Sequence, residues 1–179
     1  MTRRGGVPAR TVAAVVPVAV ALVTGMALAG CGGADARAAA SSGPVEPCGL
    51  MTAAQLHRLG ATGGRSQPAG DSLGGTACAW TNLTTPRGSE YIGRVLTGAV
   101  PGGTPSASVN GLPTAEYAPP GVDPRVSCVY LVSVGPGQTL WAQFADPNHT
   151  IPGLNHLVAC RNAQAAASAM ATAFGPLTR

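Results

Sequence analysis

Three residues near the C-terminal end of the chain could act as metal ligands or as an acid and a base. Asp146, His149 and His156 are close in the sequence, and histidine with a carboxylate can bind a metal ion or form a general-base pair. The run Asp146-Pro147-Asn148-His149 is also an ordinary turn sequence. We favour the turn, and we predict no metal site, no cofactor and no catalytic residue. His57 is expected to be a solvated side chain.

The five cysteines are the other reactive residues. If Cys31 carries a lipid, as argued below, four remain, and an even number in an exported chain predicts two disulfides. Four cysteines allow three pairings, between which the sequence alone cannot choose. We favour Cys48 with Cys78 and Cys128 with Cys160, because each pair joins elements that are neighbours along the chain. A zinc site needs ligands much closer in sequence than these cysteines, whose gaps are roughly thirty residues or more.

The first thirty residues have the layout of a lipoprotein signal peptide. Met1–Arg10 is a short cationic segment, residues 12–27 are mostly apolar, and Leu28-Ala29-Gly30-Cys31 matches the lipobox of bacterial lipoproteins. In such proteins the cysteine thiol takes a diacylglyceryl group, and a peptidase that requires small residues cuts before it. An uncleaved transmembrane helix is one alternative, but it fits the ending at Cys31 less well. Twin-arginine export is another, but the residues after Arg4 fit it less well.

This layout predicts three parts: a signal peptide over 1–30, the lipidated Cys31 with a flexible tether over 31–47, and one domain over 48–176. The domain would be extracytoplasmic, at the outer face of the cell membrane, with the membrane as its partner through the lipid anchor. Three of the eleven arginines lie in the signal peptide, so eight remain against seven acidic residues. That balance argues against nucleic acid as a partner.

Local patterns predict the elements of the domain. A capping box at Thr52 and Gln55 predicts a short helix over 53–59, and an alanine-rich run without Gly or Pro predicts a long helix over 155–174. Alternating apolar residues predict antiparallel strands. The predicted strands are 77–83, 91–99, 126–134 and 139–145, with glycine-rich loops at 60–76 and 100–110.

The order of these elements predicts an α+β fold. An antiparallel sheet would pack against a short N-terminal helix and a long C-terminal helix, with two disulfides. The expected core-facing stripe of the long helix is Leu157, Cys160, Ala163, Ala167, Met170 and Phe174.

The spacing of several motifs resembles an actinobacterial family of secreted lipoproteins with a domain of unknown function. Members typically begin with Pro-Cys-x-Leu-Leu-Thr and carry a Cys-x-Trp strand. The matching residues here are Pro47, Cys48, Leu50, Thr52, Cys78 and Trp80, with Met51 in place of the second leucine. The resemblance implies a cell-envelope location and a two-disulfide domain, and it implies no activity.

Taken together, the sequence predicts a lipid-anchored envelope lipoprotein of unknown molecular activity. We expect a non-catalytic module that binds a small hydrophobic ligand or an envelope protein, through an apolar cleft between the sheet and the helices or through a loop surface. The alternative is an extracytoplasmic hydrolase whose catalytic residues are dispersed in the sequence. One apolar pocket without convergent acid and base groups would favour the first function, and a cleft with facing His and Asp the second.

Overall fold

The computed structural model describes residues 45–85 and 88–175. The predicted signal peptide, the predicted lipidation site Cys31 and most of the predicted tether lie outside these residues. Within them, no helix has both the length and the apolar character needed to cross a membrane.

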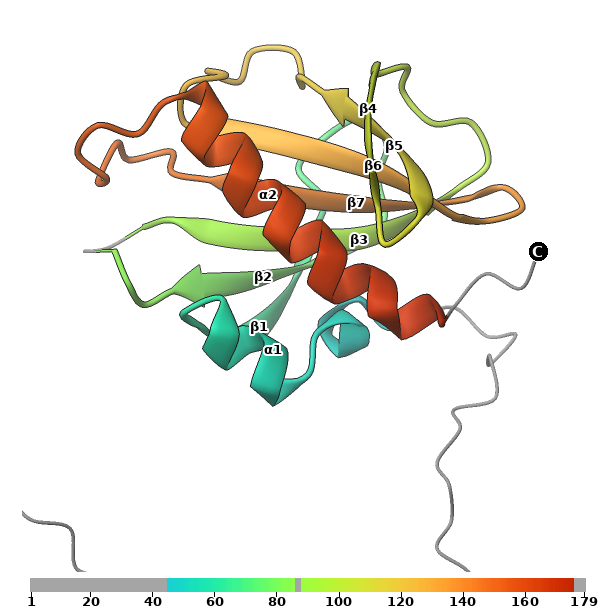
Figure 1. Ribbon diagram of the computed structural model, residues 1–179, viewed down its shortest axis with the longest axis horizontal. Helices are drawn as coiled ribbons and strands as arrows, with labels where there is room; N and C mark the ends of the chain where they lie inside the picture. Colours follow the sequence, from blue (N-terminus) through green and yellow to red (C-terminus); the bar gives the residue numbers. More distant parts are fainter. Residues whose placement is uncertain (1–44, 86–87, 176–179) are drawn as a thin grey trace, which may run out of the picture. The chain divides into compact units, whose positions relative to one another are not determined.

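Seven antiparallel strands pair in one sheet, in the order β1-β2-β3-β7-β6-β5-β4 (Figure 1). Because side chains alternate between the two faces of a strand, Cys128, Tyr130 and Val132 lie on one face, and Val129 and Leu131 lie on the other. All five are buried, so both faces of the central strands are covered. The strands are β1 (Ala61–Pro68), β2 (Thr76–Asn82), β3 (Glu90–Thr97), β4 (Thr104–Val109), β5 (Leu112–Tyr117), β6 (Ser127–Gly135) and β7 (Gln138–Ala145).

The long helix α2 (His156–Ala171) crosses one face of the sheet (Figure 1). Asn155 caps its start by accepting a hydrogen bond from the backbone N–H of Val158. Apart from Met170, the buried residues of this helix are alanines and Cys160, and such small side chains let the helix backbone approach the strands closely. Where the helix meets β3, Met170 is fully buried, and a Cβ added at Gly93 would lie 2.7 Å from its sulfur. Gly93 therefore makes the room that this large side chain fills.

The predicted stripe of α2 is wrong at its first position. Leu157 is 66% exposed, whereas Ala159 and Ala166, which the stripe omitted, are fully buried. A helix turns about 100° per residue, so Leu157 points some 200° away from Ala159 and faces solvent. Phe174 lies beyond the helix in the short 3-10 turn η2 (Thr172–Phe174), half-buried against the core.

The expected fold class, a sheet packed against two helices, is wrong. The structure is sheet-rich, and α2 is the one described helix that packs on a sheet face. The short helix α1 (Ala53–Arg58) has the expected capping box, but it lies beside the β1 edge of the sheet and buries only Gln55 (Figure 1). The amide of Gln55 donates to the carbonyl of Ala169 at 2.8 Å and to the hydroxyl of Thr172 at 2.7 Å. These bonds hold α1 to the C-terminal end of α2.

Three strands were missed at the sequence level. Residues 61–68 and 104–109 were expected to be loops, but they form β1 and β4, and β5 was not assigned. The two former strands are the outermost in the sheet, with mostly exposed side chains. An outer strand without a buried face needs no apolar alternation, so its pattern resembles that of a loop.

Two disulfides are present, and they tie the helical segments to the sheet. Cys48, in the 3-10 turn η1 (Pro47–Leu50), is bonded to Cys78 of β2. Cys128 of β6 is bonded to Cys160 of α2. These are the same two pairs that chain proximity favoured.

The described chain begins at Val45, which lines a shallow hollow with Thr76 and Val95.

Candidate functional site

The sheet face opposite α2 carries a second, smaller apolar cluster. Leu96, Val129, Leu131 and Trp141 are buried there, with Tyr117 packed against them. The Tyr117 and Trp141 rings meet nearly edge to face, with centroids 5.4 Å apart. No described helix covers this face. Loops at its margins therefore decide how much of it solvent can reach.

A pocket of about 420 Å³ opens at the end of this face where β3 begins and β7 ends. Its walls come from the sheet and from two loops that are distant in sequence, residues 121–126 and 146–149. The apolar part is formed by Ile92, Val122, Val126 and Ala145. The polar groups at its margin are Glu90, Asp123, Ser127, Gln143, Asp146 and His149.

A chain of hydrogen bonds fixes the polar side chains of the sheet at this pocket. Trp141 Nε1 donates to Gln143 Oε1 at 3.2 Å, and Gln143 Nε2 donates to the hydroxyl oxygen of Ser127 at 3.0 Å. Both the oxygen and the nitrogen of the Gln143 side-chain amide are thereby oriented. The remaining capacity of Ser127 to donate is left for another acceptor.

The loop over residues 121–126 is shaped by one aspartate. Asp123 accepts the backbone N–H of Arg125 at 2.9 Å and pairs with its guanidinium at 2.8 Å. These contacts lower the pKa of Asp123 to about 2, the side-chain hydrogen bond from Arg125 having the largest effect. The carboxylate is thus ionised and engaged with Arg125 of its own loop.

Asp146 organises the second loop. Its carboxylate accepts bonds from the backbone and hydroxyl of Thr150, at 3.0 and 2.8 Å, and from the backbone N–H of Ile151 at 2.9 Å. Burial by itself would raise the pKa of Asp146, but these hydrogen bonds outweigh it and the pKa lies below its ordinary value. This carboxylate is a structural acceptor within a turn, and its bonds leave it poorly placed to serve as a general base.

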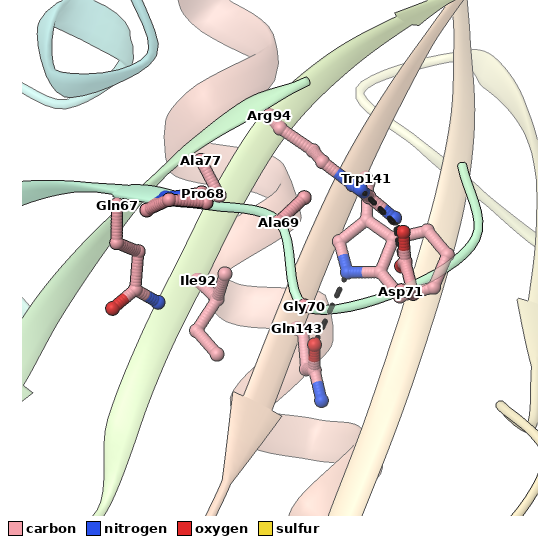
Figure 2. Close-up of a pocket in the computed structure, with 10 residues that line it drawn as sticks. All are labelled: Gln67, Pro68, Ala69, Gly70, Asp71, Ala77, Ile92, Arg94, Trp141 and Gln143. Carbon is pink, nitrogen blue, oxygen red and sulfur yellow. Dashed lines mark hydrogen bonds and ion pairs between the residues drawn. The ribbon is translucent and has the colours of Figure 1, made fainter. Parts of the chain in front are cut away.

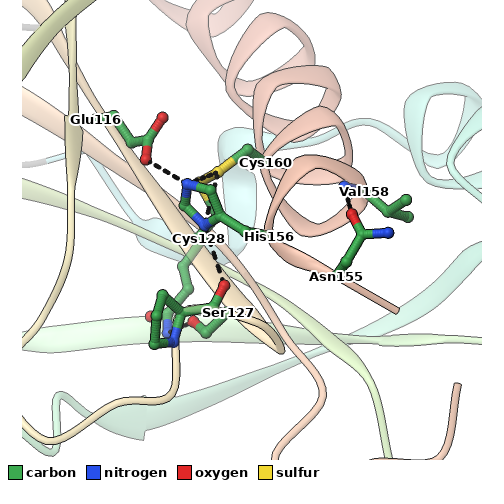
Figure 3. The surroundings of a disulfide bond; sticks show 9 residues. Glu116, Ser127, Cys128, Asn155, His156, Val158 and Cys160 are labelled. Atoms are coloured by element: carbon green, nitrogen blue, oxygen red, sulfur yellow. Dashed lines mark hydrogen bonds and ion pairs between the residues drawn. A yellow bond between two sulfur atoms is a disulfide. The ribbon is translucent and has the colours of Figure 1, made fainter. Parts of the chain in front are cut away.

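The structure separates the residues Asp146, His149 and His156, which were weighed as a candidate cluster and set aside in favour of a turn. His149 is exposed at the margin of the pocket, where its backbone N–H donates to the carbonyl of Asp146 at 3.1 Å. His156, at the start of α2, lies on the other face of the sheet, 2.8 Å from Glu116 Oε1 and beside the Cys128–Cys160 bond (Figure 3). His57 is exposed on α1.

A loop from β1 to β2 folds over the same sheet face as the pocket and is held there by a buried arginine. The Arg94 side chain is only 3% exposed; its guanidinium lies 4.4 Å from the ring centroid of Trp141. Its Nη1 donates to Asp71 at 2.9 Å and to the carbonyl of Gly74 at 3.1 Å, and Nη2 also binds Asp71 (Figure 2). The hydrogen bond from Arg94 holds the pKa of Asp71 below its ordinary value.

Beneath this loop lies a smaller hollow of about 80 Å³, which shares Ile92 and Gln143 with the larger pocket (Figure 2). The two cavities therefore adjoin across the side chains of Ile92 and Gln143. The loop fixed by Arg94 closes one end of this combined depression, and the loops at 121–126 and 146–149 close the other.

The sequence reasoning found no Gly-x-Ser-x-Gly run, and this is wrong: the same loop contains Gly70-Asp71-Ser72-Leu73-Gly74. In serine hydrolases this pattern forms a sharp turn from a strand into a helix. Here it joins two antiparallel strands, Ser72 is exposed, and Asp71 is engaged by Arg94. This loop therefore does not give Ser72 the surroundings of a hydrolase nucleophile.

The apolar residues of the pocket carry no local signal in the sequence: Ile92 and Val126 look like ordinary strand residues. Arg94, which lines the adjoining smaller hollow, looks like a solvent-facing residue. The one available clue was the pair of turn-forming runs, Val122-Asp123-Pro124-Arg125 and Asp146-Pro147-Asn148-His149, whose Asp-Pro steps mark compact loops next to two predicted strands.

A family model described as "Protein of unknown function (DUF3558)" matches residues 26–173, so the chain belongs to that family. The expected membership of a family with a domain of unknown function is confirmed. No curated protein and no solved structure matches the chain significantly.

Proposed function

We propose that this DUF3558 protein is a lipid-anchored, extracytoplasmic binding module that holds a small, mainly apolar molecule in the pocket on the sheet face opposite α2. The observation that supports it best is the pocket itself, about 420 Å³ in volume, with an apolar wall and a few oriented polar groups. Pockets for small molecules commonly have this make-up and volumes of roughly 300–1,000 Å³. The proposed ligand site is then not between the sheet and the helices, which was one of the two expected locations; loops, the other expected location, form part of its wall.

The charged side chains at the pocket favour binding over catalysis. Glu90 pairs with Arg65 at 3.1 Å, Asp123 pairs with Arg125, and Asp146 is held by its own loop. Each carboxylate is thus already occupied by a neighbour. An uncharged ligand would not disturb these pairs, whereas a strongly charged one would have to compete with them.

The pocket is tested with a neutral dye, N-phenyl-1-naphthylamine, whose fluorescence rises in apolar surroundings. We expect residues 32–179 to bind it saturably, and Val122→Trp to weaken binding at least tenfold, because the indole would fill the pocket. Val100→Trp is the matched control: Val100 and Val122 are loop valines that are 38% and 39% exposed, but Val100 does not line the pocket. Equal binding by both variants, or no binding at all, would show that the pocket is not the site.

The anchor is tested by a single substitution. Cys31→Ala is expected to abolish incorporation of a labelled fatty acid and to release or misprocess the protein, because the thiol of Cys31 is the proposed attachment point. Gly33→Ala, two residues away, should be labelled and membrane-bound like the unaltered chain. Undiminished labelling of the Cys31 variant would refute the anchor while leaving the pocket untouched.

A further inference from the structure

The Cys128–Cys160 disulfide has neighbours that the Cys48–Cys78 disulfide lacks. Within the described part of the chain, Glu116, His156 and Cys160 form the single group of potential ligands whose nitrogen, oxygen and sulfur atoms all lie within 4.8 Å of one another. Cys128 joins this group through its bond to Cys160 (Figure 3). We propose that reduction of this disulfide creates a zinc site formed by Cys128, Cys160, His156 and Glu116.

The fold brings these four side chains together from three elements. His156 and Cys160 are four residues apart on α2, so they lie on the same side of the helix. Glu116 of β5 pairs with Tyr130 of β6, and Cys128 lies two residues from Tyr130, on the same face of the sheet. The side chains thus converge where the first turn of α2 meets the sheet.

The separations suit a tetrahedral site. His156 Nε2 lies 3.6 Å from Cys160 Sγ. A nitrogen and a sulfur that are bound to one tetrahedral zinc ion, with bonds of about 2.0 and 2.3 Å, are also about 3.6 Å apart. His156 Nε2 and Glu116 Oε1 are 2.8 Å apart, and binding would widen this to about 3.3 Å. The two sulfurs of the reduced pair would separate to about 3.8 Å.

The surroundings of His156 resemble those of a metal ligand. Its Nδ1 lies 3.0 Å from the carbonyl oxygen of Pro124, so an N–H there donates to the backbone and directs Nε2 toward Glu116. In the oxidised chain Nε2 faces Glu116 Oε1 at 2.8 Å, and zinc would lie between these two atoms. The His156 and Glu116 side chains are 50% and 34% exposed, which gives an ion access from solvent, while both cysteines are buried beneath them.

The chemistry needs a dithiol reductant. It transfers two electrons and two protons: the bond between Cys128 and Cys160 breaks, each cysteine becomes a thiol, and the reductant becomes a disulfide. Zinc binding then releases the two thiol protons. The site exists only in the reduced protein, so the redox state would decide whether this end of α2 is held by a covalent bond or by a metal ion.

The experiment titrates the full chain with cobalt(II), before and after reduction with a phosphine. We expect the reduced protein to bind one equivalent with a thiolate-to-cobalt charge-transfer band and the visible bands of tetrahedral cobalt, displaced by zinc, and the oxidised protein to show none. His156→Gln, which keeps all cysteines, should weaken binding at least tenfold. His57→Gln, at an exposed histidine of α1, is the matched control and should bind like the unaltered chain.

Three results would overturn the proposal: no thiolate band in the reduced chain, a band that His156→Gln leaves unchanged, or a band that persists in a Cys128→Ser variant. A reduced protein that unfolds and is not refolded by zinc counts equally against it. None of these outcomes bears on dye binding at the pocket, so the two proposals stand or fall separately.

Discussion

Replacing Asp71 with alanine is expected to lower the free energy of unfolding by about 2–3 kcal/mol. The substitution leaves the Arg94 guanidinium buried without its carboxylate, and breaking a fully buried ion pair from one side costs roughly 3–5 kcal/mol. The expected loss is smaller because the Asp71 side chain is 37% exposed and water can partly solvate what remains. Chemical denaturation with urea measures it.

Two variants serve as controls for this prediction. Arg65→Ala removes an exposed ion pair with Glu90 and should change stability by less than about 1 kcal/mol. Adding Arg94→Met to Asp71→Ala should recover part of the loss, because an apolar side chain over Trp141 needs no partner. If Asp71→Ala costs no more than Arg65→Ala, the guanidinium is not the buried anchor of the loop.

The sign of the pH dependence follows from the same pair. The pKa of Asp71 is lowered below 3.8 in the folded chain, mainly by the hydrogen bond from Arg94. Its contribution to stability is therefore complete above the unfolded pKa and is lost as the pH falls through the folded one. The stability difference between the unaltered chain and Asp71→Ala should shrink as the pH is lowered below about 4.

Removing the Cys48–Cys78 disulfide, by Cys48→Ala with Cys78→Ala, is expected to lower stability by ~3–4 kcal/mol. The bond closes a loop with a sequence separation of 30 residues, and in the chain-entropy model such a loop restricts the unfolded chain by about this amount. Typical domains have only ~5–15 kcal/mol of stability, so the variant would melt at a markedly lower temperature. Calorimetry provides the measurement.

Because this effect acts mainly on the unfolded chain, the native packing around Trp80 should persist. Trp80 is buried. Gly64 lies close to both Trp80 and the disulfide, because a Cβ added there would be 3.0 Å from the indole nitrogen and 3.0 Å from Cys78 Sγ. The near-ultraviolet circular dichroism of the variant should therefore match that of the unaltered chain below its melting temperature. A loss of less than about 1 kcal/mol would contradict the entropic account.

The sequence predicted the centre of the sheet well. Strand β6 is buried on both faces, by α2 on one and by the second apolar cluster on the other, so apolar side chains occur on both faces. The expected strand over 126–134 is within one residue of the observed Ser127–Gly135. The long helix was placed within three residues at its C-terminal end, where a 3-10 turn replaces the last helical turn. Burial imposes a period on these segments, and the period is visible in the sequence.

The margins of the sheet were missed for the opposite reason. β1 and β4 bury almost nothing, so no period marks them. One signal was available: Asn110-Gly111, both with positive φ, forms the two-residue turn that favours a hairpin between β4 and β5. Asparagine and glycine adopt this conformation readily. The Asn-Gly dipeptide between Val109 and Leu112 could therefore have predicted a strand on each side of it.

The pocket could not be predicted, since it depends on long-range contacts. Ile92, Ser127 and Gln143 belong to three strands that become neighbours only through the strand order β3-β7-β6. Arg94 looks like a surface residue within β3 until Asp71, from a loop 23 residues earlier, covers it. Charge pairing across such distances leaves no mark in a local pattern.

Two features of the described domain lie at opposite ends of β3. The described chain enters beside Thr76 and Val95, while the pocket lies at the opposite end of β3, at Glu90. Five residues of extended strand separate Glu90 from Val95, a distance of roughly 17 Å. The mouth of the proposed pocket therefore lies at the end of β3 that is remote from the start of the described chain.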